Sequence, residues 1–162
     1  MKIFIYPANS LILSDLVERF GHQPLVIMKE IRKKVTDPGL DSPPLNMTPD
    51  DAKKGLKYAA IEIPSGVRGR MSLMDSLIEQ AEAAIIVEDA DYMFGCMGCA
   101  RTNELLKYTI RSKGIPVLEL KYPKGENEAK NFVLYVKEFL DNLAVPGKKP
   151  ELAPEPKQEV KR

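Results

Sequence analysis

One stretch constrains the fold of this chain more than any other: a short apolar run, a pair of cysteines and a helix-like segment in succession. The run Ala83–Val87 (AAIIV) ends in three β-branched residues, which is typical of a strand buried on both faces of a parallel sheet. The only cysteines of the chain, Cys96 and Cys99, follow it as a C-x-x-C pair, and Ala100–Lys113 has a helical pattern. In open α/β sheets, ligands bind beyond the carboxyl ends of the strands. We therefore predict that the functional site lies around this cysteine pair.

Strand-like and helix-like patterns alternate through the rest of the chain. Further strands are predicted at Lys2–Tyr6, Pro24–Met28, Ala59–Ile63 and Pro116–Leu120. Helices are predicted at Leu11–Phe20, from Thr48 to about Tyr58, at Met71–Ala81 and at Asn127–Leu143. This alternation predicts one α/β domain over residues 1–143, a three-layer Rossmann-like fold with a mostly parallel sheet of about five strands. Residues 144–162 are rich in proline and charge, and we predict a disordered tail there.

Composition excludes several classes of protein. The 162 residues include 24 lysines and arginines against 23 acidic residues, a net charge of +1, which argues against a nucleic-acid binder. No apolar run approaches the ~20 residues that cross a bilayer, so no membrane association is expected. The amino-terminal residues lack a signal-peptide layout, and a cytoplasmic location is expected. In a reducing compartment two cysteines indicate metal binding, redox chemistry or burial. The single histidine, His22, is interpreted as a surface turn residue.

Two segments between the predicted elements carry clustered cations. Residues 29–47 begin with Lys29, Arg32, Lys33 and Lys34 and continue through many turn-forming residues, so they form either a long loop or an excursion from the sheet. The segment Pro64–Arg70 contains Arg68, Arg70 and two glycines, and we expect a loop ahead of a helix. Such a loop can cradle an anion, although the spacing matches no established phosphate-binding motif, and a plain turn is the alternative.

A parallel sheet brings the ends of all its strands to one side, so polar residues that follow different strands are expected to share a crevice. The residues predicted to line it are Asn9, Lys29, Arg68, Arg70, Glu88, Asp89, Cys96, Cys99, Arg101 and Tyr122. The arginines among them supply positive charge that would suit an anionic ligand or thiolates.

Three chemistries fit a C-x-x-C at the start of a helix. A redox dithiol would gain a lowered thiol pKa from the helix and from the adjacent Arg101, but the motif follows the fourth predicted strand, unlike the thioredoxin arrangement. A structural zinc site needs four ligands, and the chain offers two thiolates, His22 and carboxylates such as Asp89 or Asp91, so we rank zinc lower. Burial without a chemical role is a further alternative.

An iron–sulfur cluster is the third chemistry. One C-x-x-C supplies half of the four thiolates that a cluster usually takes, so the other half would come from a homodimer or from a partner protein. Gly95 and Gly98 beside the cysteines would let the backbone approach sulfide, and the arginines would offset the negative charge. Cys96 and Cys99 are therefore the candidate metal ligands.

Three blocks of the sequence resemble a known family. The opening residues 3–35, the segment PSGVRGRM and the block VEDADYMFGCMGCARTNELL resemble the methanogenesis marker protein 5 family of archaea. The resemblance covers Lys2 to about Leu143. It implies an accessory role in methane metabolism, because some other marker proteins mature or activate methyl-coenzyme M reductase. It carries over no catalytic residues.

A fainter resemblance is to the iron–sulfur subunits of 2-hydroxyacyl-CoA dehydratases, through cluster cysteines at strand ends and the segment KGIPVLELKYP at Lys113–Pro123. The chain departs from them in having one small domain and two cysteines. Three hypotheses follow: an accessory protein that holds or relays an iron–sulfur cluster, a binding protein or enzyme for a small anionic metabolite or cofactor precursor, and a scaffold that docks partners through Thr36–Asn46 and the tail.

Overall fold

A computed structural model of the chain describes residues 1–34, 48–89 and 97–143, with the backbone alone at 33, 34 and 97–99. Its strands are β1 (Lys2–Tyr6), β2 (Gln23–Leu25), β3 (Ala83–Glu88) and β4 (Val117–Lys121). Its helices are α1 (Leu11–Arg19), α2 (Ile27–Lys34), α3 (Pro49–Lys54), the 3-10 helix η1 (Gly55–Lys57), α4 (Ser65–Gln80), α5 (Met97–Ser112) and α6 (Glu126–Leu143). The mixed α/β class is confirmed. No helix of these residues is long and apolar enough to cross a membrane.

The four strands form one parallel sheet in the order β2-β1-β3-β4. From β1 the chain passes through α1 to β2, which pairs with one edge of β1. It then returns to place β3 along the other edge of β1. The strand order therefore reverses between β1 and β3. In open α/β sheets such a reversal opens a crevice at the carboxyl ends of the two strands.

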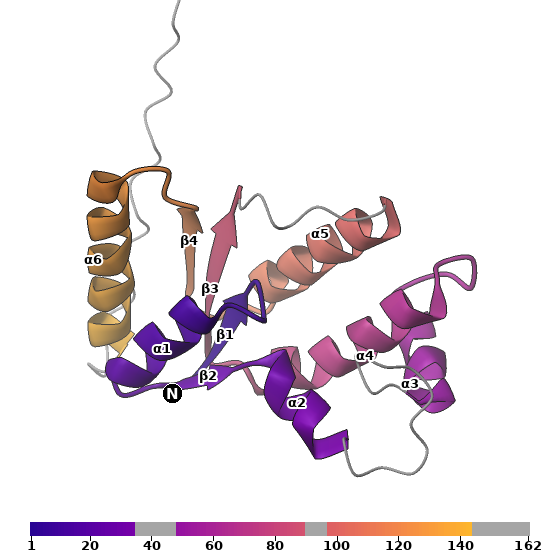
Figure 1. Cartoon of the computed structure of the whole chain (residues 1–162). Coiled ribbons are helices and arrows are strands. Elements are labelled where there is room, and N and C mark those ends of the chain that lie inside the picture. Colours follow the sequence, from indigo (N-terminus) through magenta and orange to yellow (C-terminus); the bar gives the residue numbers. More distant parts are fainter. Residues whose placement is uncertain (35–47, 90–96, 144–162) are drawn as a thin grey trace, which may run out of the picture.

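Helices cover both faces of the sheet (Figure 1), which confirms the three-layer arrangement. Side chains of a strand alternate between its two faces, so Ile3 and Ile5 of β1 join one core cluster while Phe4 and Tyr6 join the other. The first cluster includes apolar residues of α1 and α6, and the second those of α4 and α5. The crevice between β1 and β3 is thus bordered by α5 on the second face.

The predicted strand at Ala59–Ile63 is wrong, so the sheet has four strands among the described residues and not five. The segment instead turns between η1 and α4, with the Ile63 N–H donating to the Ala60 carbonyl at 3.0 Å. Ile61 is 70% exposed and buries little apolar surface. Two β-branched residues in so short a run resemble a strand, but none of the described strands pairs with the segment.

The predicted loop at Pro64–Arg70 is also wrong, because α4 begins at Ser65 and contains Gly66 and Gly69. Pro64 occupies the N-cap, and a glycine inside a helix costs only about 1 kcal/mol, which tertiary packing can offset. Gly69 is one of the buried residues of this helix. Arg68 and Arg70 therefore project from a helix and do not line a flexible phosphate loop.

The second predicted strand, Pro24–Met28, is shorter than expected, since β2 ends at Leu25 and α2 starts at Ile27. The first residues of the basic segment 29–47, for which a long loop or an excursion from the sheet is predicted, therefore belong to the helix α2. His22 is half-buried just before β2, and its Nε2 donates to the Leu140 carbonyl of α6 at 3.1 Å. It thus links two elements instead of lying free in a surface turn.

Candidate functional site at the carboxyl ends of β1 and β3

An open pocket of about 380 Å³ lies at the crevice that the strand order predicts. Its wall is formed by Tyr6, the last residue of β1, and by four residues of α5: Ala100, Arg101, Asn103 and Glu104. Because α5 follows β3, the pocket joins the ends of the two strands between which the order reverses. Topology and cavity geometry thus indicate the same place independently.

Tyr6 forms the strand side of the pocket. The residue is 2% exposed, and burial raises the pKa of its phenol, while the positive charges of Lys107 and Arg70 act in the opposite direction. The hydroxyl therefore stays protonated at neutral pH and can donate a hydrogen bond. Within the described part of the chain, no group accepts a hydrogen bond from this hydroxyl or donates one to it. A ligand in the pocket could use this donor.

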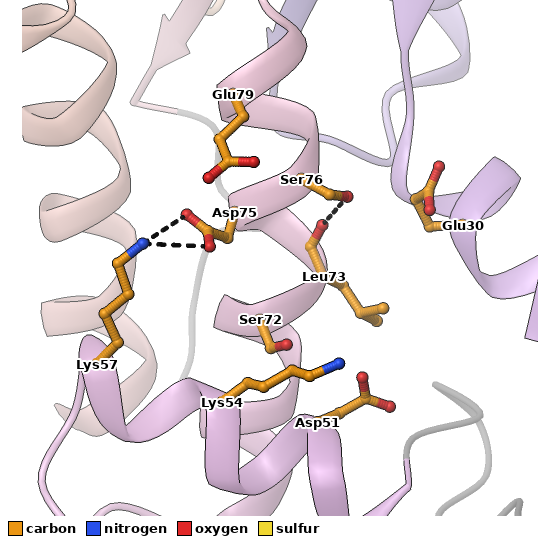
Figure 2. Close-up of a pocket in the computed structure, with 9 residues that line it drawn as sticks. All are labelled: Glu30, Asp51, Lys54, Lys57, Ser72, Leu73, Asp75, Ser76 and Glu79. Carbon is orange, nitrogen blue, oxygen red and sulfur yellow. Dashed lines mark hydrogen bonds and ion pairs between the residues drawn. The ribbon is translucent and has the colours of Figure 1, made fainter.

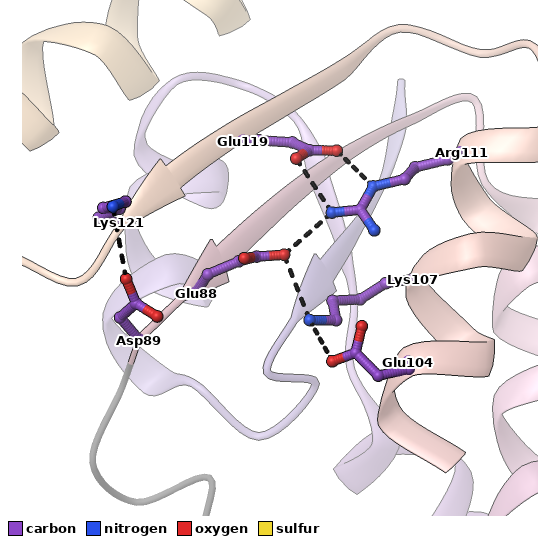
Figure 3. A network of polar contacts seen from close by, with 7 residues as sticks. All are labelled: Glu88, Asp89, Glu104, Lys107, Arg111, Glu119 and Lys121. Carbon is purple, nitrogen blue, oxygen red and sulfur yellow. Dashed lines mark hydrogen bonds and ion pairs between the residues drawn. The ribbon is translucent and has the colours of Figure 1, made fainter. Parts of the chain in front are cut away.

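A network of ion pairs fixes α5 against the sheet beside the pocket (Figure 3). Lys107 Nζ lies 3.2 Å from a Glu88 carboxylate oxygen and 2.6 Å from one of Glu104. Arg111 reaches the same Glu88 oxygen at 2.9 Å and contacts Glu119 of β4 at 2.6 Å. The network joins the end of β3, the middle of α5 and β4, so α5 is held in register with both strands.

The pKa shifts of this network follow from partial burial and from the ion pairs. Burial of Glu88 would raise its pKa, but hydrogen bonds from Lys107 and Arg111 outweigh burial and lower it. Burial of Lys107 would lower its pKa, but hydrogen bonds to Glu104 and Glu88 outweigh burial and raise it. The Lys107 side chain, only 7% exposed, is therefore an ammonium group at neutral pH and not an amine nucleophile.

The structure separates the three predicted arginines. Arg101 lines the pocket, and Arg70 is half-buried and close enough to act electrostatically on Tyr6. In the described residues neither has an ion-pair partner. Arg68 has a different environment, because its Nε donates to the Ile63 carbonyl at 3.1 Å and its Nη1 to the Ala52 carbonyl at 3.0 Å. Its contacts are with α3 and the turn ahead of α4.

Other residues predicted for the common crevice are only partly brought together. Glu88 lies at the end of β3 beside α5, and the Tyr122 N–H donates to its carbonyl at 2.8 Å. Asp89 pairs with Lys121 at 3.7 Å, so these groups follow β3 and β4. Lys29 instead approaches Glu18 of α1 at 3.7 Å. Asn9 is exposed in the turn after β1.

The cysteine motif adjoins the same helix. Gly95 and Cys96 lie outside the described residues, and so do the long segment 35–47 and the tail. The backbone places Gly98 and Cys99 in the first turn of α5. Nowhere in residues 1–34, 48–89 and 97–143 do three or more His, Cys, Asp or Glu side chains form a metal site.

A second pocket, of about 430 Å³, lies away from the strand ends between α2, α3 and α4 (Figure 2). Its lining mixes acidic and basic side chains: Asp75 of α4 accepts from the Tyr58 hydroxyl and from Lys57 Nζ at 3.4 Å. Asp51 belongs to the capping box at the start of α3. These contacts give Asp51, Lys57 and Asp75 structural roles, and the pocket lies away from the strand ends, so the smaller pocket at the sheet is the better candidate.

Sequence reasoning missed Tyr6, Asn103 and Lys107. A signal for each was present, since Tyr6 ends the first strand, and Asn103 and Lys107 are four residues apart on the helix after the cysteines. The spacing predicts one helix face, but only the packing of that helix shows which face meets the strand end. The sequence alone favoured the arginines because charge is visible without a structure.

Comparison with known proteins places the chain in a family. Residues 1–143 match a family described as "Uncharacterized protein conserved in archaea (DUF2112)". A protein of Methanocaldococcus jannaschii, named as uncharacterized protein MJ0404, is 61% identical over 142 residues, covering 88% of this chain and 95% of that protein. No solved structure matches the chain. The match spans β1 to the end of α6 and so includes the whole described fold, and the chain belongs to this archaeal family.

Proposed function

We propose that this chain is an accessory protein of archaeal methane metabolism that holds or relays an iron–sulfur cluster through Cys96 and Cys99. Its role would be the maturation or activation of a methanogenic enzyme such as methyl-coenzyme M reductase. The observation that supports the proposal is the start of α5 at Met97: the backbone of Cys99 belongs to the first turn of the helix whose next residues line the pocket. The relative in the methanogen Methanocaldococcus jannaschii is consistent with this setting.

The position at a helix start suits thiolates. Free backbone N–H groups and the helix dipole favour negative charge at the first turn, and Arg101 adds a cation two residues after Cys99. Both effects lower the pKa of a thiol and stabilise the anionic sulfur that binds iron. The same features would serve a redox dithiol, so the experiment must measure iron directly.

The ligand count supports a shared cluster. A typical cluster takes four thiolates, and the chain has two cysteines. Among the described side chains, which do not include those of the two cysteines, no three His, Cys, Asp or Glu groups gather at a metal site. The missing ligands would therefore come from a second copy of the chain or from the protein being matured, and the proposal includes such a partner.

The test is the iron, sulfide and zinc content of the full chain purified without oxygen, measured together with its visible spectrum. We expect about two irons and two sulfides per chain, half of a four-iron cluster, or the same ratio after reconstitution. Cys96→Ser and Cys99→Ser should each abolish iron binding. Ser112→Ala, at the far end of α5, serves as the control and should retain it. Zinc alone, or no metal after reconstitution, would refute the proposal.

A second candidate function has its own supporting observation. Arg101 lines the pocket at Tyr6, Arg70 acts on the same hydroxyl, and neither arginine is paired within the described residues. This arrangement supports binding of a small anionic metabolite or cofactor precursor. A ligand that binds only the folded state stabilises it with the logarithm of its concentration, so the melting temperature should rise with a small anion and not with neutral analogues.

A further inference from the structure

The pocket at the carboxyl ends of β1 and β3 contains polar groups with unused hydrogen-bonding capacity. The Asn103 Oδ1 atom is buried, and no described residue donates a hydrogen bond to it. The Tyr6 hydroxyl also lacks a partner there, and the Arg101 guanidinium has no carboxylate partner in the described chain. A buried acceptor without a donor is unfavourable, and native proteins seldom retain one without a role.

The neighbouring polar groups do not share this property. Glu88, Glu104, Lys107 and Arg111 are all held in ion pairs between 2.6 and 3.2 Å. Glu104 also lines the pocket, but its carboxylate is committed to Lys107. The unpartnered groups thus all belong to residues that line the pocket, on α5 and at the end of β1.

We propose that this pocket binds a small organic anion that also carries a hydroxyl group. The anionic head would contact Arg101 and accept a hydrogen bond from the Tyr6 hydroxyl, and the ligand's hydroxyl would donate to Asn103 Oδ1. Arg70 adds positive potential to the pocket. This potential disfavours a ligand that would offer an ammonium group, in place of the hydroxyl, as the donor to Asn103 Oδ1. The inference rests on the second candidate function above and names its ligand class.

Size and protonation agree with this assignment. A volume of about 380 Å³ lies within the range of small-metabolite pockets, roughly 300–1,000 Å³. Burial raises the pKa of Tyr6, so its hydroxyl remains a donor at neutral pH. The ion-pair network holds α5 in place, so the donors and acceptors are positioned before the ligand arrives.

The experiment is a titration of the full chain, followed by amide chemical shifts in nitrogen-15 NMR spectra, with three probes: acetate, glycolate and glycerol 3-phosphate. Glycolate should bind at least threefold more tightly than acetate, because only glycolate can donate to Asn103. Comparison with glycerol 3-phosphate shows whether the head is a carboxylate or a phosphate. The shifted amides should cluster at the end of β1 and along residues 100–104.

Variants test the residue assignments. Arg101→Gln should weaken glycolate binding at least tenfold, and Tyr6→Phe should weaken it severalfold. The exposed Arg32→Gln on α2 should leave it unchanged. Asn103→Leu should remove the preference for glycolate over acetate. Arg101 is exposed, so the Arg101→Gln chain should give the same dispersed NMR spectrum as the unmodified chain, which would confirm that its fold is intact.

The outcomes separate this inference from the proposals on which it depends. Arg101-dependent binding without any preference for the hydroxylated probe would overturn the inference and leave the second candidate. No saturable shift with any probe, or Arg101→Gln binding as well as the unmodified chain, would overturn both. Glycolate binding by a chain that holds no metal after reconstitution would refute the cluster proposal alone, and a cluster-bearing chain that binds no probe would refute the inference alone.

Discussion

At the scale of single residues, Gly55 marks the closest approach between two elements. A Cβ atom added to Gly55 would lie 2.0 Å from the backbone oxygen of Arg68 and 2.4 Å from its carbonyl carbon. Backbone cannot move aside as a side chain can, so we expect Gly55→Ala to lower the free energy of unfolding by about 3 kcal/mol. Denaturant unfolding should show a lower midpoint with an unchanged slope.

Gly125 provides the matched control, because an added Cβ there meets nothing within 4 Å. We expect Gly125→Ala to change the free energy of unfolding by less than about 0.5 kcal/mol. Equal effects of the two substitutions would contradict the close packing of η1 on α4.

The contrast between Arg68 and Arg70 also originates in tertiary packing. Their positions in the sequence are nearly equivalent, and only tertiary packing places the Ala52 carbonyl beside one of them.

At the scale of elements, α5 depends on ion pairs to stay in register with β3 and β4. Glu88→Gln removes the carboxylate that Lys107 and Arg111 share. We expect a loss of roughly 1–2 kcal/mol at neutral pH, a modest value because Glu88 is partly exposed to solvent. Asp15→Asn, in the exposed pair with Arg19, should cost less than about 0.5 kcal/mol and is the control.

The pH dependence of that loss identifies its cause. The folded-state pKa of Glu88 lies below the ordinary 4.5, so its carboxylate stabilises the fold fully above pH 4.5. The contribution disappears as the pH falls through the folded-state pKa. The difference in unfolding free energy between the unmodified chain and Glu88→Gln should therefore shrink below pH 4.5. A difference that stays constant from pH 7 down to pH 3 would indicate lost packing and not lost charge.

Elements also show where sequence reasoning succeeds. The strands β1, β3 and β4 and the helices α1, α5 and α6 were predicted to within about three residues at each end, because each has a long apolar periodicity tied to one or two buried faces. The errors fell where local signals conflict with packing, at the isoleucines of Ala59–Ile63 and the glycines of α4. A site at the carboxyl ends of the strands was predictable from the parallel α/β pattern, but the strand order and the lining of the pocket required the structure.

At the scale of the whole molecule, both core clusters are completed by residues that precede the tail. The last core residues are Phe139 and Leu140 of α6, with Leu143 packed at their edge, and the family match also ends at residue 143. The prediction of one domain over residues 1–143 has a direct test. A chain ending at Leu143 should unfold cooperatively, with a melting temperature within about 2 °C of the full chain, since no described core contact is lost.

A chain ending at Pro123, before α6, should behave in the opposite way. It would uncover the core cluster that Val136 and Leu140 share with α1 and the sheet, and burying each such side chain contributes about 1.5–3 kcal/mol. The three buried residues of α6 together approach the whole net stability of a domain, about 5–15 kcal/mol, so this chain should not fold. Circular dichroism and calorimetry distinguish the two truncations. If ending the chain at Leu143 also abolished the cooperative transition, the tail would belong to the folded unit, and the domain could not be treated as complete at the end of α6.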